Sequence, residues 1–125
     1  MIVLTLDQLI ELHAFVIVET GGSRGLRDLG RLEAALATQT QSVFGAELYE
    51  TLHDKAAALI RGIVADHPFV DGNKRTAMLV GLTFLRVNDA KFIAQKGELE
   101  DFAVQVATEH LDVPAISVWL GAHSR

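Results

Sequence analysis

Apolar residues recur along most of this chain at the three- and four-residue spacing of amphipathic helices. Residues that commonly begin helices precede several of these stretches, namely Thr5, Asp28 and Pro114. Gly21-Gly22 ends the first stretch. The pattern predicts helices over roughly 5–20, from Asp28 to about Leu36, and over about 47–65, 73–88, 98–110 and from Pro114 onward.

The predicted helix over 47–65 has one apolar face, which includes Leu48, Leu52, Leu59 and Ile63. A polar connection over 38–44 leads into it. Pro68 stops this helix at or before His67, because the residue before a proline is pushed out of the α region. We therefore expect His67 at the helix end or just beyond it.

The helix predicted over 73–88 is apolar on nearly all sides in its middle. Such a helix is buried by its neighbours, and this one is too short to span a membrane. Short extended pieces are expected over 1–4 and 92–94. The sequence therefore predicts an all-α fold: a single domain over 1–125, a compact bundle of about six helices with the 73–88 helix in the middle.

Composition excludes only a few kinds of site and partner. The chain has 125 residues, 50% of them hydrophobic, no cysteine and a net charge of −5. The missing cysteines exclude disulfides and thiolate metal sites, and the acidic balance disfavours direct binding to nucleic acid. We see no secretory signal and no apolar run long enough for a membrane span, so we expect a cytoplasmic protein.

The candidate chemistry lies between the two central helices, in the segment His67-Pro68-Phe69-Val70-Asp71-Gly72-Asn73-Lys74-Arg75-Thr76. A helix start offers free N–H groups to an anion, and Lys74 and Arg75 add two cations there. Asp71 supplies a hard oxygen of the kind that holds Mg²⁺ together with phosphates. His67 can take a proton from a hydroxyl near neutral pH. Taken singly, each residue has an ordinary explanation as a solvated side chain, a turn or a helix cap.

Outside this segment we expect structural roles. Gly21-Gly22-Ser23-Arg24-Gly25 lacks the ending of a phosphate-binding P-loop and is interpreted as a helix stop. Arg27 and Asp28 could shape the site, although helix capping is the favoured role, and Arg61 could reach the same end or lie on the surface. His53, His110 and His123 lack the spacing of metal ligands. Trp119 is expected in the core.

The segment resembles the signature of the Fic/Doc family, His-x-Phe-x-Asp/Glu-Gly/Ala-Asn-Gly/Lys-Arg, and it meets each of those positions. The resemblance extends toward the N-terminus in the manner of the Doc (death-on-curing) branch and is weakest after about Ala90. It is carried there by Leu12-His13, Gly21-Gly22, Gly25-Leu26-Arg27-Asp28-Leu29-Gly30 and Leu32-Glu33-Ala34-Ala35.

The resemblance implies an enzyme that uses ATP and Mg²⁺ to modify a protein hydroxyl. It makes His67 the general base, makes Asp71 the magnesium ligand, and gives catalytic roles to Asn73 and Arg75. The nucleotide phosphates would be bound by the group Gly72, Asn73, Lys74 and Arg75. Phe69 is expected to pack inward and anchor the loop.

Two departures from the usual Fic signature favour the Doc branch. Fic AMP-transferases commonly have glycine at the position of Lys74 and a second arginine at the position of Met78. By resemblance, a Doc protein is a toxin that acts as a kinase, phosphorylates a threonine of elongation factor Tu and halts translation. Its partner is a small antitoxin whose C-terminal segment docks as a helix. AMP transfer is the alternative reaction, and a catalytically idle helical module that binds a partner is the alternative class.

Overall fold

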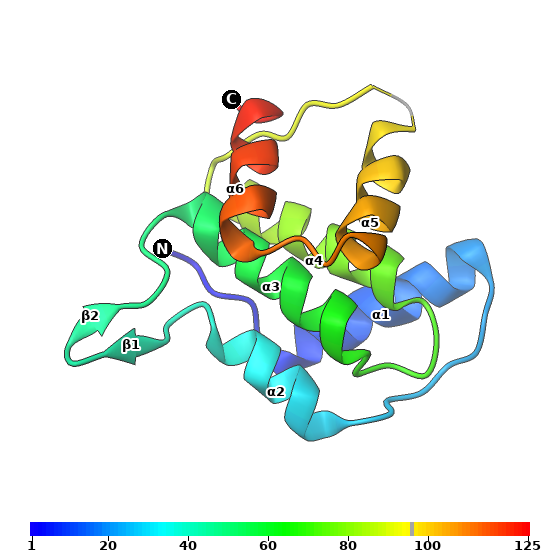
Figure 1. Cartoon of the computed structure of the whole chain (residues 1–125). Helices are drawn as coiled ribbons and strands as arrows, with labels where there is room; N and C mark the ends of the chain where they lie inside the picture. Colours follow the sequence, from blue (N-terminus) through cyan, green and yellow to red (C-terminus); the bar gives the residue numbers. More distant parts are fainter. Residues whose placement is uncertain (96) are drawn as a thin grey trace.

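Six helices account for most of residues 1–95 and 97–125, which the structure describes. In this computed structural model the helices are α1 (Leu6–Thr20), α2 (Leu29–Ala37), α3 (Leu52–Asp66), α4 (Asn73–Val87), α5 (Glu98–Thr108) and α6 (Val113–Ala122). Strands β1 (Ser42–Val43) and β2 (Ala46–Glu47) pair antiparallel in a hairpin that projects from the body of the molecule (Figure 1). The all-α fold predicted from the sequence is confirmed.

Side chains cap four of the helices at the start. Thr5, Asp28, Thr51 and Asp112 each accept a hydrogen bond from an N–H in the first turn of the helix that follows. Thr5 and Gln8 form the reciprocal capping box that their spacing indicates. Gly21 ends α1, as predicted. These local signals set the helix boundaries correctly at both ends of α1 and at the start of α2.

The prediction of a helix from residue 47 was wrong, because the hairpin occupies that part of the chain. Phe44 and Gly45 adopt left-handed backbone, with φ of 51° and 81°, and reverse its direction. The Leu48 N–H then donates to the Gln41 carbonyl at 2.8 Å, which extends the pairing. Leu48 is 46% exposed instead of buried, and α3 begins only at Leu52.

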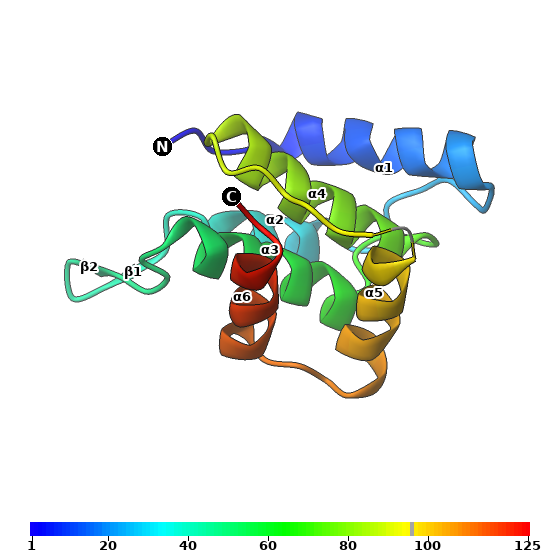
Figure 2. The ribbon, with the colours of Figure 1, turned by 90° about the horizontal axis from the view of Figure 1, so that it is seen from above.

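Two helices, α3 and α4, form the centre of the bundle. Helix α3 packs against α2, α4, α5 and α6, and α4 lies between α1 and α5 (Figure 2). A Cβ on Gly81 of α4 would lie 2.5 Å from Ile60 Cδ1, so alanine at this position would displace the buried Ile60 side chain. The central position predicted for the 73–88 helix is confirmed, and α3 shares it.

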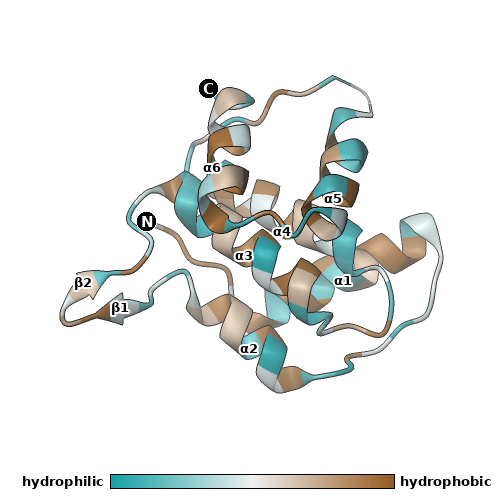
Figure 3. Ribbon diagram, viewed as in Figure 1, coloured by the Kyte–Doolittle hydropathy of each residue, from teal (hydrophilic) through white to brown (hydrophobic). Residues whose placement is uncertain are grey.

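Apolar side chains from all six helices meet around this pair. Apolar and polar residues alternate along the helices, as expected where each helix buries one side (Figure 3). Trp119, expected in the core, is partly buried against it and stacks on Phe102 with ring centroids 3.9 Å apart. The fully buried side chains include Leu9, Leu32, Leu59, Ile60, Ile63, Val80, Phe84, Leu85, Ile116 and Leu120.

The last residues of the chain return to the segment before α5. Lys91 and Arg125 exchange two backbone hydrogen bonds, of 3.1 and 2.8 Å, and Phe92 pairs with Ser124. The extended piece expected over 92–94 is therefore a single pairing with the C-terminal end. No helix among the described residues has the length and apolarity that crossing a bilayer requires.

Candidate functional site

His67 stands at the end of α3. Its backbone is left-handed, with φ of 47° and ψ of 59°, a conformation that residues other than glycine adopt infrequently. Its N–H still donates to the Ile63 carbonyl at 3.2 Å, and Pro68 cannot continue the helix because it has no N–H. This helix-end position confirms the sequence prediction, and it leaves the imidazole exposed.

The loop between α3 and α4 is closed from within by Asn73. The Phe69 N–H donates to Asn73 Oδ1 at 3.0 Å, and Asn73 Nδ2 donates to the Phe69 carbonyl at 2.9 Å. Both polar groups of this buried amide are thus used inside the loop. The structure gives the Asn73 side chain a positioning role. The catalytic and phosphate-binding roles expected of Asn73 stay predictions.

A buried histidine of α1, His13, contacts the inner side of the loop. The His13 ring stacks on Phe69 with centroids 3.9 Å apart and an interplanar angle of 4°. Its Nε2 lies 2.9 Å from the Asp71 carbonyl oxygen, which can only accept, so Nε2 carries the proton. Phe69 packs inward as predicted, and His13 fixes the backbone of the loop at Asp71.

The connection between α1 and α2 clamps the same loop from another side. The N–H groups of Arg27 and Asp28 both donate to the Pro68 carbonyl, at 2.7 and 3.0 Å. The Val70 N–H donates to the Gly25 carbonyl at 3.0 Å. Backbone groups of the motif loop are therefore satisfied by a segment about 40 residues earlier in the chain.

Arginine side chains hold the carbonyl end of α3. Arg27 donates through Nε to the His67 carbonyl at 2.8 Å and through a terminal nitrogen to the Asp66 carbonyl at 3.0 Å. Arg31 donates to the same Asp66 carbonyl at 2.9 Å. Cations there satisfy free carbonyls and complement the helix dipole. Asp28 caps α2, as predicted, whereas Arg27 fixes the backbone of His67.

Asp71 is held at the surface by two main-chain donors. Its Oδ2 accepts from the Ser23 N–H at 3.1 Å and its Oδ1 from the Gly72 N–H at 2.9 Å. These two hydrogen bonds, aided by the nearby Arg75 guanidinium, lower the pKa of Asp71 below its ordinary value of 3.8. A Cβ at Gly22 would lie 2.6 Å from Oδ2, so this approach requires glycine. The carboxylate is ionised at neutral pH.

This donor set fits Mg²⁺ shared with phosphates. The described residues contain no group of three or more His, Asp or Glu side chains able to hold a metal. Magnesium is commonly held by one or two carboxylates, with phosphate oxygens and water completing the octahedron. A single exposed, ionised Asp71 next to the start of α4 matches that pattern. It does not match a closed structural metal site, in which several side chains surround the ion.

The start of α4 has no side-chain cap within the described residues. Gly72 precedes it in left-handed backbone, with φ of 74°, and a Cβ there would lie 3.1 Å from Ile17 Cδ1. Lys74 and Arg75 are exposed in its first turn, and neither takes part in an ion pair among the described residues. Free N–H groups and two cations without an ion pair at one helix start are the arrangement expected of an anion site.

The structure thus brings the predicted residues to one junction of α3 and α4, with His67, Asp71, Lys74 and Arg75 exposed. Sequence reasoning named Arg27 as a residue that could shape the site, but it missed the roles of His13, Gly22, Ser23 and Arg31. The sequence did carry signals for two of them. His13 is a polar residue on the apolar face of α1, and Gly22 is a second glycine beyond the one that ends the helix. Nothing local to the motif indicated the contacts from Ser23, Arg27 and Arg31.

Comparison with known proteins gives consistent matches. Residues 3–85 match the model of the Fic/DOC family. The chain is 40% identical over 102 residues to "Toxin Doc" of Mycolicibacterium smegmatis, covering 80% of this chain and 78% of that protein. It is 33% identical over 111 residues to "Protein kinase doc" of Escherichia phage P1, covering 89% of this chain and 86% of that protein.

Proposed function

The chain belongs to the Fic/DOC family, and on that premise we propose that it is a toxin of a toxin–antitoxin pair. In this proposal it transfers the terminal phosphate of ATP to a protein hydroxyl. The acceptor we propose is a threonine of elongation factor Tu, whose modification would halt translation in the cytoplasm.

One observation carries this proposal above the others: among residues 1–95 and 97–125, the start of α4 has no side-chain cap and its two cations have no ion-pair partner, next to an ionised carboxylate and an exposed imidazole. Cations at a helix N-terminus are unfavourable without an anion to compensate them. A polyphosphate supplies that anion, and Asp71 lies where a magnesium ion could bridge it to the protein.

The transfer requires a base, an anion site and a fixed geometry. The hydroxyl oxygen of the acceptor attacks the γ-phosphorus, and the bond from that phosphorus to the bridging oxygen of ADP breaks. His67 takes the hydroxyl proton, and ADP leaves with the electron pair. Lys74, Arg75 and the first N–H groups of α4 stabilise charge on the phosphoryl oxygens.

Asp71 would hold the magnesium ion, which neutralises phosphate charge when bound. Asn73 and His13 keep the loop in shape, and Arg27 fixes the backbone that carries His67. Positioning of this kind contributes much of the rate in phosphoryl transfer, because the protein does little covalent chemistry there.

AMP transfer on the same scaffold is the competing reaction. Lys74 disfavours it, because a lysine side chain fills space that a glycine would leave for the α-phosphate region and adds a cation suited to a terminal phosphate. Met78 stands where the AMP-transferase pattern has a second arginine. These two residues support the kinase reaction.

Labelled ATP distinguishes the two reactions. The protein would be incubated with elongation factor Tu and Mg²⁺, with ATP labelled at the γ position in one reaction and at the α position in another. We expect label on the acceptor from the γ position only. Label from the α position only would replace phosphate transfer by AMP transfer.

Nucleotide binding separates both enzymes from an idle module. Calorimetry should detect saturable binding of Mg²⁺–ATP that Asp71→Ala weakens strongly, because the variant lacks the carboxylate proposed to hold the metal. An unmodified protein that binds no ATP would leave the partner-binding module as the function.

The partner we propose is a small antitoxin whose C-terminal segment docks as an amphipathic helix. An apolar hollow of about 270 Å³ between α1, α4 and α5 suits such a helix, with Arg75 at its border. Its apolar lining includes Phe15, Val16, Met78, Leu79, Leu82, Leu99 and Ala103. Phe15→Ser should weaken co-purification with the antitoxin and leave phosphate transfer unchanged, whereas equal recovery would move the docking site elsewhere.

A further inference from the structure

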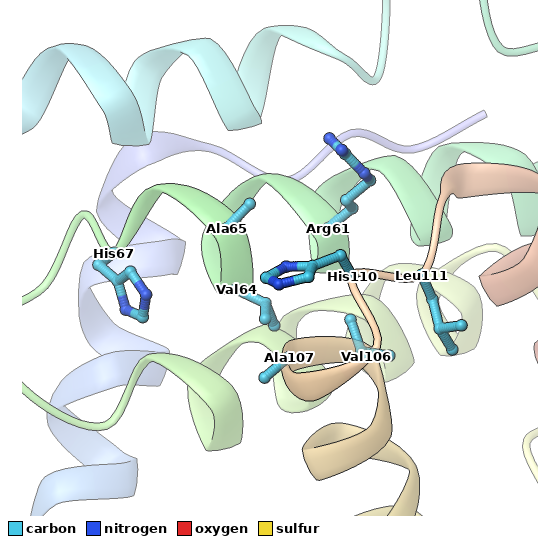
Figure 4. A pocket seen from close by; sticks show the side chains of 8 residues that line it. All are labelled: Arg61, Val64, Ala65, His67, Val106, Ala107, His110 and Leu111. Carbon is cyan, nitrogen blue, oxygen red and sulfur yellow. The ribbon is translucent and has the colours of Figure 1, made fainter.

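A second hollow adjoins His67 on the side of α5. Its volume is about 150 Å³, and it lies between the ends of α3 and α5. Figure 4 shows the imidazoles of His67 and His110 reaching into it from opposite sides. We call it the His67–His110 cavity. Its remaining lining residues are Arg61, Val64, Ala65, Val106, Ala107 and Leu111.

Both histidines have unusual backbone. His110 has a φ of 51° and His67 a φ of 47°, and each follows the last turn of a helix. At the end of α5 the Leu111 N–H reaches back to the Val106 carbonyl at 3.3 Å, the closure in which glycine or asparagine usually occupies the left-handed position. Two strained histidines that border one cavity are a reason to expect a function there.

The cavity is separate from the anion site. Within the part of the chain that the structure describes, none of the residues Asp71 to Arg75 lines it, although His67 does. A general base must lie within hydrogen-bond reach of the proton that it accepts. Because His67 lines the cavity and belongs to the same short loop as the start of α4, it is suitably placed to receive a hydroxyl from that cavity.

We propose that the His67–His110 cavity seats the hydroxyl-bearing side chain of the protein acceptor, which rests on the proposed transfer reaction. The hydroxyl would donate to His67, and the methyl group of a threonine would pack against Val106 and Ala107. His110 would hydrogen-bond to the acceptor beside it. The cavity is smaller than the several hundred Å³ of sites that enclose whole small molecules, so it suits one side chain.

The alternative occupant is the base of the nucleotide, and kinetics can separate the two. The test uses the unmodified protein and three variants. Ala107→Leu fills the cavity, and His110→Asn removes the imidazole but keeps a residue that tolerates left-handed backbone. Ala122→Leu, the matched control, adds the same side chain on the exposed end of α6.

Initial rates are measured with γ-labelled ATP against the concentration of elongation factor Tu and, separately, of ATP. We expect Ala107→Leu to lower kcat/KM for the acceptor at least about 10-fold, because a blocked cavity prevents the near-attack arrangement. His110→Asn should raise the acceptor KM roughly 2- to 10-fold, the value of one hydrogen bond. The calorimetric Kd for Mg²⁺–ATP and the behaviour of Ala122→Leu should stay unchanged.

A peptide from the acceptor with serine in place of the target threonine gives an independent measure. Losing one buried methyl group should lower kcat/KM roughly 3- to 5-fold, and Ala107→Leu should abolish that preference. A preference that is the same in both proteins would contradict the proposed packing against Ala107.

Other outcomes are equally decisive. Variants that weaken ATP binding and leave the acceptor KM unchanged would assign the cavity to the nucleotide. Acceptor kinetics that are the same in all four proteins would overturn the cavity assignment alone. Absence of transfer by the unmodified protein would overturn the proposed function and this inference with it.

Discussion

Two buried side-chain amides lie at opposite ends of the central helices and make the same pattern of hydrogen bonds. Asn73 pairs with the N–H and C=O of Phe69, and Gln39 pairs with the N–H and C=O of Leu4, at 2.7 and 3.0 Å. Each side-chain amide hydrogen-bonds to a backbone N–H and C=O, as a neighbouring strand would. Without it, these two buried backbone groups would have no partners.

The charges around the two amides are used differently. Beside Gln39, the buried ammonium group of Lys55 donates to the Gln39 carbonyl at 2.9 Å and to Glu47 at 3.0 Å. Beside Asn73, Lys74 and Arg75 stay exposed and unpaired among the described residues. A cation whose partners are all within the protein contributes to folding, whereas one left free is available to a ligand. The comparison predicts that substitutions near Asn73 lower activity and that substitutions near Gln39 lower stability.

The largest expected effect is at the site end. His67→Ala should lower the transfer rate roughly 10²–10⁴-fold, the usual loss for a general base, with the midpoint of urea unfolding nearly unchanged because the side chain is exposed. Initial rates and urea titration measure the two quantities.

His67→Asn is the matched variant, since asparagine tolerates left-handed backbone but cannot take the proton. It should be as inactive as the alanine variant. A full rate in either well-folded protein would remove His67 from the reaction.

The next effect belongs to the hairpin end. Gln39→Leu leaves the buried N–H and C=O of Leu4 without partners, so it should lower the free energy of unfolding by about 2–4 kcal/mol. The transfer rate per folded molecule should not change. Gln41→Leu, at an exposed position in the same connection, is the control and should be neutral. A lower transfer rate per folded molecule in the Gln39 variant would show instead that the hairpin end of the bundle affects the site end.

Arg27 tests whether the backbone clamp matters to the chemistry. Arg27→Gln should lower kcat on the order of 10-fold, since small displacements of a catalytic group are costly, with the ATP KM unchanged. Arg27→Lys should recover only part of the rate, because an ammonium cannot match the guanidinium fork that spans two carbonyls. Arg24→Gln in the same loop serves as the control. A matching fall in ATP affinity would point to a direct contact with nucleotide instead.

The smallest effect concerns a charged pair remote from both amides. His123 Nδ1 faces the Trp119 carbonyl at 2.7 Å and Nε2 faces Glu98 at 3.0 Å, so both nitrogens need protons. The Trp119 carbonyl and then Glu98 raise the pKa of His123 above 6.5. The N–H of Gln95, followed by His123, lowers the pKa of Glu98 below 4.5.

Each shift has its own pH dependence. The contribution of His123 is complete below about pH 6.5 and is lost as pH rises through its raised pKa, and that of Glu98 is complete above about pH 4.5 and is lost on acidification. The Tm of the natural protein should therefore exceed that of His123→Gln most between about pH 4.5 and 6.5, by a small margin because the pair is partly exposed. A difference that does not vary with pH would mean that His123 acts through packing on Trp119.

The sequence by itself determined most helix boundaries and the contents of the motif. Caps such as Thr5 and Asp28 and the apolar spacing of α1 act over a few residues, so a one-dimensional pattern reveals them. Local propensity failed over about 47–51, where a hairpin with two left-handed residues and the pairing of Leu48 with Gln41 replaced the first turn of the predicted helix.

Only the tertiary structure decided what holds the motif in place. His13, Ser23 and Arg27 reach the loop across separations of 58, 48 and 40 residues, and His110 lines one cavity with His67 only because α5 packs on α3. Hydrogen bonds and packing at such separations depend on how the helices assemble, and helical periodicity contains no information about that assembly. The chemistry of the site is therefore local in the sequence, whereas its geometry is a property of the assembled bundle.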